Sequence, residues 1–546
     1  MTSSLLDIGT VASKIGISEA DLERYGNNMA KVSLSVIERS RKNRRGKLIL
    51  VTAMNPTKEG EGKTTTTIGL GQALDQLGKK VAIAIREPSL GPCFGIKGGA
   101  TGGGKSTVEP SDRINLIFTG DFPAVSAAHN LLSAMINNHI YHGNKLRIDP
   151  RKVTFPRTID MNDRSLRDII VGSGGSESGV LMKDKFVITP ASEIMAILGL
   201  SMSYSDLKDR LSKILVGYSY DGKPVFAGDL KAHGAMAALL RDALKPNLVQ
   251  TAEGVPAFVH IGPFGNIAHG TSSLVADQMA LGLVDYLVTE AGFGSELGAE
   301  KFFDLVSRIG QLPIDAVVIV ATIRSIKLNA GVADSSAENV EAVEAGVQNV
   351  LKHVSIIRNF GIEPVVAINR FPTDTEAEIK KLEEILKEDN ISWALSEVYA
   401  KGGKGGIGLA EKVLKSLETP HGEIKRTYSE DDSVKDKIEA IARKVYGASQ
   451  VVFEKRALSD LKQIDKLNLG KSYVCMAKTQ YSVTDNPALL GWPKNFRISV
   501  KSISISAGAG FVVPMLGDIM TMPGLPTEPA AVNVDLTDDG KIVGLF

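Results

Sequence analysis

The chain has 546 residues, of which 43% are hydrophobic and 23% are charged, a globular composition that excludes extended disorder. Its formal net charge of +1 gives no overall field that would favour nucleic acid or an anionic membrane. Two cysteines, Cys93 and Cys475, argue against a disulfide scaffold and against a cysteine metal cluster.

The first residues, MTSSLLDIGTVASKIG, lack the basic, apolar and small-residue order of a secretion signal. No apolar run reaches the roughly 18 residues that are needed to cross a bilayer. The basic run from Arg39 to Lys47 precedes the first strong strand pattern and is typical of a solvated face. We therefore expect a cytoplasmic protein that binds neither nucleic acid nor membrane.

Short apolar runs recur along the first two thirds of the chain, each followed by a helical pattern. These runs are KLILVTA (47–53), KVAIAI (80–85), PAFVHIG (256–262), DYLVTEAG (285–292), DAVVIVAT (315–322) and EPVVAIN (363–369). Runs of this kind are typical of parallel strands buried on both faces. The patterns over 64–78 and 338–361 predict crossover helices, the second ending at Gly361. The predicted fold class is α/β, with a P-loop-type, mostly parallel sheet, flanking helices and additional smaller α/β domains.

Two changes in composition predict domain boundaries. A charge-rich helical pattern follows residue 373, and helix, loop and short strand patterns alternate after residue 447. We expect a nucleotide-binding domain over residues 1–365, a central α/β domain over 366–455 and a C-terminal domain over 456–546.

The first strand pattern leads into a glycine-bearing turn and a helical pattern, NPTKEGEGKTTTTIGL (55–70). The usual phosphate-loop pattern, G-x-x-x-x-G-K-[S/T], has glycine where this chain has Thr57. Backbone N–H groups of residues 60–63 would face phosphate oxygens at the positive end of the helix. Lys63 would bridge the outer phosphates, and the Thr64 hydroxyl is the expected ligand of Mg²⁺. The residues expected to bind the nucleotide are Thr57, Lys58, Glu59, Gly60, Glu61, Gly62, Lys63, Thr64 and Thr65.

Arg86 and Glu87 leave the second strand pattern at the end nearest this loop, just before the glycine cluster GIKGGATGGGK. An arginine there can bind a carboxylate or phosphoryl group through two hydrogen bonds, which the neighbouring glycines favour. The alternative is a surface Arg–Glu pair of little consequence. No guanine-specific N-K-x-D motif is found at AINRFPTDT (367–375), so a reaction on small molecules is favoured over a switch.

Other polar and aromatic residues follow later strand patterns. His260 and His269 do not match a zinc motif, so positions lining a loop or buried in the core are favoured. Phe371 and Tyr399 lie at or just after strand ends, where a ring could stack on a flat ligand. Taken alone, these aromatic residues are better explained by packing.

An ordered set of segments resembles the formate–tetrahydrofolate ligase family, from about residue 50 to about residue 530. The segments are PTKEGEGKTTTT, REPSLGP, GIKGGATGGGK, FTGD, VTEAGFG, VATIRSIK, FPTDT, AKTQYS and MPGLP. In that family, threonine at the first loop position is normal. The resemblance implies that ATP, formate and tetrahydrofolate give 10-formyltetrahydrofolate, ADP and phosphate through formyl phosphate. It also implies Mg-ATP as a substrate, a monovalent cation and a homotetramer.

The resemblance assigns roles to residues already singled out. Lys63 and the loop would hold ATP, and Arg86 would hold formyl phosphate, so both are expected to be catalytic. Phe371 and Tyr399 would sandwich the pterin ring, which reverses the interpretation based on packing. Phe293 is expected to line the same folate pocket. The first domain would then carry the formyl-phosphate site, and the central domain would contribute to the folate site.

The sequence departs from the family pattern on the acceptor side. Lys105 stands where tyrosine is usual, Ile117 and Pro123 replace two histidines, and Tyr399 replaces a tryptophan. These changes indicate a divergent ligase with intact phosphate handling and with weaker folate affinity or a modified pterin as acceptor. One alternative is an ATP-dependent ligase that forms formyl or acyl phosphate for another amine. Another is a nucleotide-gated binding protein without catalysis.

Overall fold

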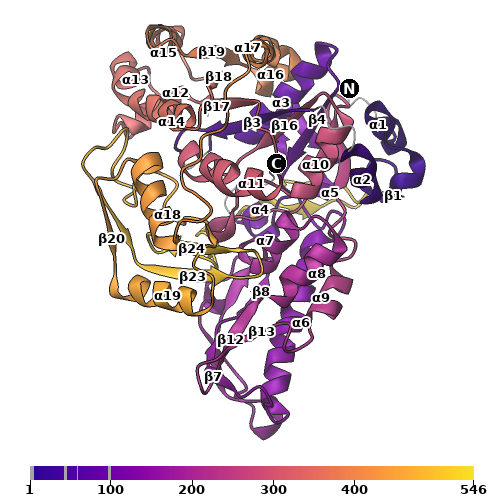
Figure 1. Cartoon of the computed structure of the whole chain (residues 1–546). Coiled ribbons are helices and arrows are strands. Elements are labelled where there is room, and N and C mark those ends of the chain that lie inside the picture. The colour runs from indigo at the N-terminus through magenta and orange to yellow at the C-terminus, as the bar shows by residue number, and fades with distance from the viewer. Residues whose placement is uncertain (1–4, 42–45, 58–59, 96–99, 546) are drawn as a thin grey trace.

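The computed structural model describes residues 5–41, 46–57, 60–95 and 100–545. Its centre is a large, mostly parallel sheet, which lies in the upper half of Figure 1. The strands in spatial order are β1 (Leu22–Arg24), β2 (Ala30–Val32), β14 (Asn247–Thr251), β15 (Pro256–Val259), β4 (Val81–Ile85), β16 (Tyr286–Glu290), β3 (Lys47–Ala53), β17 (Ala316–Ala321), β18 (Val365–Asn369) and β19 (Ser392–Ser396). A hairpin of β5 (Gly102–Gly103) and β6 (Ser106–Glu109) joins the sheet at β14.

All six apolar runs form strands of this sheet, which confirms the predicted α/β class. Pairing is parallel from β15 through β4, β16, β3, β17 and β18 to β19. β15 is antiparallel to β14 on its other side, so the parallel part ends there. The carboxyl ends of the parallel strands therefore meet at one edge, where ligands of such sheets bind.

Alternate side chains of the strands pack on opposite faces of the sheet. In β3, Ile49 and Val51 belong to one buried cluster, and Leu48 and Leu50 belong to another. The first face is covered by α3 (Lys63–Gln76) and α17 (Ile407–Glu418), and the second by α10 (Leu274–Leu283), α14 (Gln348–Asn359) and α15 (Glu376–Glu388). Burial on both faces explains why these strands are apolar throughout.

The predicted helices are confirmed with one correction. The pattern over 338–361 forms two helices, α13 (Val340–Gly346) and α14, instead of one. The break follows Gly346, whose backbone packs so closely on α12 (Ile323–Asn329) that an added Cβ would lie 1.9 Å from the Ile326 carbonyl oxygen. Gly361 has φ +91° and ends the second helix as expected. The charge-rich helix α15 begins with a capping box in which Thr375 and Glu378 bond each other's backbone N–H groups.

Two smaller lobes extend from the sheet (Figure 1). One contains α6 (Asp121–Tyr141), α7 (Glu193–Leu200), α8 (Tyr204–Ser212) and α9 (His233–Leu239) with β7 (Ile148–Val153), β8 (Arg157–Ile159), β12 (Leu215–Ser219) and β13 (Pro224–Phe226). The other contains α18 (Val434–Ala440) and α19 (Lys455–Lys466) with β20 (Gln450–Phe453), β22 (Arg497–Val500), β23 (Ser502–Ser506) and β24 (Phe511–Met515). The expected boundary after residue 365 falls inside β18, and that after 455 falls at the start of α19. The division into three domains stays a prediction. Among the described residues, no helix is long and apolar enough to span a bilayer.

Candidate active site

The segment expected to bind phosphate, residues 55–65 and called the phosphate loop below, lies between the end of β3 and the first turn of α3 at the carboxyl edge of the sheet. Gly60 and Gly62 have φ values of +81° and +69°, which glycine adopts without strain. Gly62 also needs to lack a Cβ, because that atom would lie 2.4 Å from the Asn369 Nδ2 atom. This Nδ2 donates to the Glu61 carbonyl oxygen at 2.9 Å, and α3 begins at Lys63. Thr64 and Thr65 follow in its first turn, whereas Lys58 and Glu59 lie outside the described residues.

The Glu61 side chain supports the loop from within. Its Oε1 accepts from the Thr57 backbone N–H at 2.8 Å and from the Ser325 hydroxyl. Burial raises the pKa of Glu61 to about 7, although these hydrogen bonds favour its ionised form. The Gly60 N–H donates to the Thr57 carbonyl at 3.3 Å. Thr57 and Glu61 thus fix the shape of the loop.

Asn55 ties the base of the loop to distant parts of the chain. Its Nδ2 donates to the Glu296 carboxylate at 2.9 Å and to the Gln480 carbonyl at 3.0 Å. Its Oδ1 accepts from Asn349 Nδ2 at 2.8 Å. The buried Lys478 ammonium lies 3.2 Å from the same Glu296 carboxylate. The sequence motifs did not identify this network, since its members are spread from residue 55 to residue 480.

Thr64 and Arg86 meet at one carboxylate, that of Glu290. The Thr64 hydroxyl donates to Glu290 Oε2 at 2.8 Å, and Arg86 Nε lies 3.9 Å from Glu290 Oε1. Arg86 also donates to the Pro263 carbonyl at 3.3 Å. Gly292 leaves room for the guanidinium, because a Cβ there would lie 3.0 Å from it. Sequence reasoning singled out Thr64 and Arg86 but missed Glu290, although a charged residue closing a buried strand pattern was a usable signal.

The donor atoms at this point suit Mg²⁺, which binds oxygen ligands and usually shares them with substrate phosphates. The Thr64 hydroxyl lies in the first turn of α3 and supplies such an oxygen. Within the described ranges, no group of three or more His, Cys, Asp or Glu side chains is placed to hold a metal ion.

Glu87 does not pair with Arg86, contrary to the alternative of a surface ion pair. Its side chain is buried, and burial together with the nearby Asp121 charge raises its pKa well above the usual range. Asp121 itself accepts a hydrogen bond from the buried Lys31 ammonium at 2.7 Å. Arg86 Nε instead lies 3.9 Å from Glu290 Oε1, an ion-pair distance without a hydrogen bond, and the guanidinium donates to the Pro263 carbonyl.

Both histidines after β15 are buried. His260 is hydrogen-bonded through Nδ1 to the Ser273 hydroxyl at 2.7 Å and through Nε2 to the Ala243 carbonyl at 2.8 Å, which confirms a structural position. Burial lowers the pKa of His260 to about 4. Burial and the nearby Arg86 charge lower the pKa of His269 to about 3, so both imidazoles are neutral at pH 7.

The aromatic residues expected to bind folate follow neighbouring strands at the same edge. Phe371 comes two residues after β18, and Tyr399 lies in α16 (Val398–Lys401) after β19. The Arg324 guanidinium lies over the Phe371 ring, 4.4 Å from its centroid, and donates to the Gly60 carbonyl of the phosphate loop at 3.3 Å. One face of Phe371 is therefore covered, while Tyr399 is 58% exposed. Their role in folate binding stays a prediction.

The glycine hairpin β5–β6 packs against Tyr399. A Cβ on Gly104 would lie 2.0 Å from the Tyr399 carbonyl oxygen, and one on Gly103 would lie 3.0 Å from its ring. The Lys105 N–H donates to the same carbonyl at 2.9 Å, while the Lys105 side chain is exposed. Phe293 has φ +62° and is partly exposed. The expected place of Phe293 in the folate site stays a prediction.

The other two departures from the family pattern lie on the surface. Ile117 is 62% exposed, and Pro123 is exposed in the first turn of α6, where a missing N–H costs no helical hydrogen bond. The structure explains how proline is tolerated at position 123.

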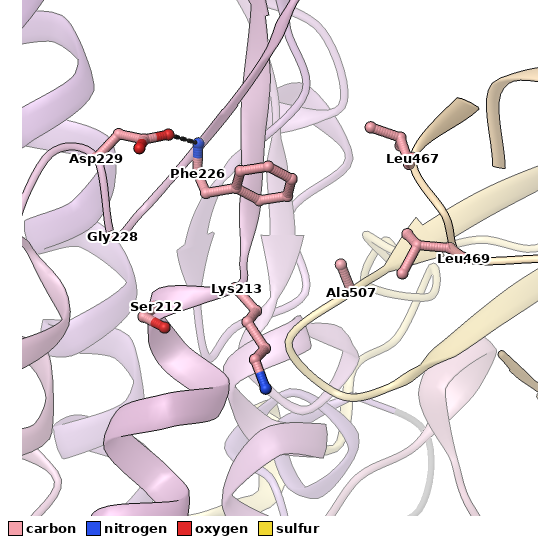
Figure 2. A pocket seen from close by; sticks show the side chains of 8 residues that line it. All are labelled: Ser212, Lys213, Phe226, Gly228, Asp229, Leu467, Leu469 and Ala507. Carbon is pink, nitrogen blue, oxygen red and sulfur yellow. Dashed lines mark hydrogen bonds between the residues drawn. The ribbon is translucent and has the colours of Figure 1, made fainter. Parts of the chain in front are cut away.

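A cavity of about 360 Å³ lies elsewhere, between the lobe that carries α8 and the C-terminal lobe (Figure 2). Its lining is largely apolar and includes Phe226, Leu467 and Leu469. Its charged groups are already engaged, because Lys213 pairs with Asp209 at 2.6 Å and Asp229 accepts the Phe226 N–H. Both of these side chains are therefore held by partners within the chain.

The fold and the sheet edge are typical of an α/β enzyme that binds a phosphorylated ligand at a helix N-terminus. The family model for formate–tetrahydrofolate ligase matches residues 1–546. Relatives with that name are 68% identical over 540 residues in Thermoplasma acidophilum and 66% identical over 540 residues in Thermoplasma volcanium, covering 99% of this chain and 100% of each relative. One from Picrophilus torridus is 56% identical over 531 residues, covering 97% of this chain and 98% of the relative. The chain belongs to the formate–tetrahydrofolate ligase family, which confirms the predicted family and enzyme class.

Proposed function

We propose that this protein joins formate to tetrahydrofolate by way of formyl phosphate, with Mg-ATP as the phosphoryl donor. Its family membership supports the ATP-dependent ligase activity. The observation that carries the proposed intermediate is the meeting of Thr64 and Arg86 at the Glu290 carboxylate. It puts an arginine beside the start of the helix at which the ATP phosphates would lie.

In the first step, a formate oxygen attacks the γ-phosphorus of ATP and the bond to the ADP oxygen breaks. The transferred group carries negative charge, so catalysis depends on positioning and on cationic groups more than on a strong base. Lys63, at the first position of α3, would hold the outer phosphates. Arg86 would hold the formyl phosphate, with Glu290 fixing its orientation. Bound Mg²⁺ would supply further neutralisation of phosphate charge.

In the second step, N10 of tetrahydrofolate attacks the formyl carbon. The carbon–oxygen bond breaks, phosphate leaves with the oxygen that came from formate, and the N10 proton passes to solvent. Tyr399 and Phe371 would hold the pterin at the edge of β18 and β19, next to the loop. The two steps together consume ATP, formate and tetrahydrofolate and give ADP, phosphate and 10-formyltetrahydrofolate.

Oxygen transfer tests this sequence of steps directly. Turnover with ¹⁸O-labelled formate should give phosphate that contains one ¹⁸O per molecule, together with 10-formyltetrahydrofolate. Hydroxylamine added in the absence of folate should trap formyl hydroxamate. Unlabelled phosphate and no hydroxamate would overturn the intermediate, and no folate product at saturating substrates would overturn the reaction.

Formate-stimulated ADP formation with another amine would instead support the alternative acceptor. The homotetramer and the monovalent cation, which the resemblance implied, stay predictions, as does the cytoplasmic location. Light scattering of the purified protein would test the first, and replacement of K⁺ by a tetraalkylammonium ion in the assay would test the second.

A further inference from the structure

Glu290 occupies the central position of the candidate active site. It is the last residue of β16, which lies between β4 and β3 in the sheet. Residue 86 directly follows β4, and the helix that carries Thr64 follows β3. Because all three strands are parallel, their carboxyl ends bring the two groups to Glu290 from opposite sides.

The carboxylate divides its two oxygens between these neighbours. Oε2 accepts the Thr64 hydroxyl hydrogen at 2.8 Å, and Oε1 faces Arg86 Nε at 3.9 Å. The Glu290 side chain is 4% exposed and the Arg86 side chain is 23% exposed. Burying an ionised carboxylate costs free energy unless the charge is paired. The Glu290 charge at this strand end is therefore expected to interact with a cation.

The hydrogen-bond direction leaves Thr64 ready to bind a cation. Since its hydrogen is directed at Glu290, the lone pairs of the hydroxyl oxygen remain available. In nucleoside-triphosphate enzymes with a phosphate loop, Mg²⁺ is held by the loop serine or threonine and by an acidic residue from another strand. The ion keeps several waters and needs only one or two carboxylates besides the phosphates.

We propose that Glu290 is this acidic residue, so that it positions Mg²⁺ with Thr64 and orients Arg86 with its other oxygen. The inference rests on the proposed use of ATP. In this proposal the Glu290 side chain serves both sites. One carboxylate oxygen supports Mg²⁺ binding, and the other supports the arginine that would bind formyl phosphate. The proposal concerns the metal response of nucleotide binding, which can be measured without turnover.

The test compares nucleotide affinity with and without Mg²⁺ by calorimetry, using a non-hydrolysable ATP analogue. The variants are Glu290→Gln, which removes the charge, and Glu290→Asp, which keeps it on a shorter chain. Glu397→Gln is the matched control, because Glu397 follows β19 at the same edge and pairs with Lys401 instead. The electron paramagnetic resonance spectrum of Mn²⁺ with nucleotide and protein gives a second readout.

We expect the nucleotide affinity of Glu290→Gln without Mg²⁺ to stay within about threefold of wild type. The increase in nucleotide affinity that Mg²⁺ causes should fall by about 10- to 100-fold, as for other residues that support metal ligands. Glu290→Asp should retain part of the gain, and Glu397→Gln should retain all of it. A purely structural role would weaken metal-free and Mg²⁺-bound nucleotide alike. That outcome, or an unchanged gain in Glu290→Gln, would overturn the proposal.

The outcomes for the reaction and for the metal are separable. If the wild-type protein makes 10-formyltetrahydrofolate and Glu290→Gln keeps the full Mg²⁺ gain, only the role of Glu290 is wrong. If the wild-type protein makes no folate product and Mg²⁺ still tightens nucleotide binding through Glu290, only the proposed reaction is wrong.

Discussion

Replacing Tyr399 by alanine should weaken folate binding and leave phosphate chemistry intact. A tyrosine buries about 150–250 Å² when fully covered, so the 58% exposure of Tyr399 leaves about 100 Å² for a ligand. A pterin covering about half of that area would contribute about 1.3 kcal/mol at ~25 cal/mol per Å². Stacking geometry adds about 1 kcal/mol. The total of about 2 kcal/mol corresponds to roughly a 30-fold change in affinity.

The assay is steady-state formation of 10-formyltetrahydrofolate with varied folate, supported by direct folate binding to the ATP-free protein. We expect Tyr399→Ala to raise the folate KM about 30-fold with little change in kcat, because stacking is present in both the ground state and the transition state. Tyr399→Phe keeps the ring and should stay within about threefold of wild type. Unchanged folate kinetics in Tyr399→Ala would refute the stacking assignment.

Three further changes test the phosphate loop, the glycine hairpin and a partly buried carboxyl. Lys63→Ala should abolish ATP-dependent turnover while folate binding remains, which equilibrium binding would show. Gly104→Ala should raise the folate KM at least tenfold, because its Cβ would lie 2.0 Å from the Tyr399 carbonyl oxygen. Burial raises the pKa of Glu193 to about 7, so its unfolded form ionises first and the folded state loses stability between pH 4.5 and pH 7. Glu193→Gln should avoid that loss of about 3 kcal/mol, measured as the difference from wild type in denaturant unfolding at pH 4.5 and pH 8.

For each of these substitutions, one outcome would contradict the prediction. Turnover by Lys63→Ala above one tenth of wild type would remove the lysine from phosphate binding. Gly143→Ala is the control for the hairpin, since Gly143 also has positive φ, at +92°, but an added Cβ there meets nothing within 4 Å. An equal folate KM in the Gly104 and Gly143 variants would exclude the clash. A parallel pH dependence of Glu193→Gln and wild type would mean that this carboxyl ionises normally in the folded state.

Six strands of the sheet could be predicted because a strand that is buried on both faces is apolar along its whole length. Each of these strands, namely β3, β4, β15, β16, β17 and β18, is a short apolar run. The hydrophobic effect favours its burial whichever strands lie next to it. The order of the strands in the sheet is not indicated by any local sequence pattern. The position of β16 between β4 and β3 depends on crossovers of many residues, so the sequence could not show that Glu290 would lie beside Arg86.

In the candidate site, the turn before α3 could be predicted because its residues are contiguous in the sequence, whereas contacts between distant segments could not. Residues 60–65 of the phosphate loop stand together in the chain, and glycine with positive φ is expected there. The support of that loop is not contiguous: Ser325 bonds Glu61, and Arg324 bonds the Gly60 carbonyl. Arg324 also covers Phe371, a contact that a strand-end aromatic alone could not indicate.

The hydrogen bonds of Asn55 join the base of the phosphate loop to residues that are synthesised much later. Its partners include Asn349, Glu296 and the Gln480 carbonyl, and Glu296 is in turn paired with Lys478. Because β3 pairs with β16 and β17, a growing chain cannot complete this strand before residue 321 is made, and the base of the loop acquires its last contacts only after residue 480 has left the ribosome. The loop between β3 and α3 is therefore fully supported only in a nearly complete chain.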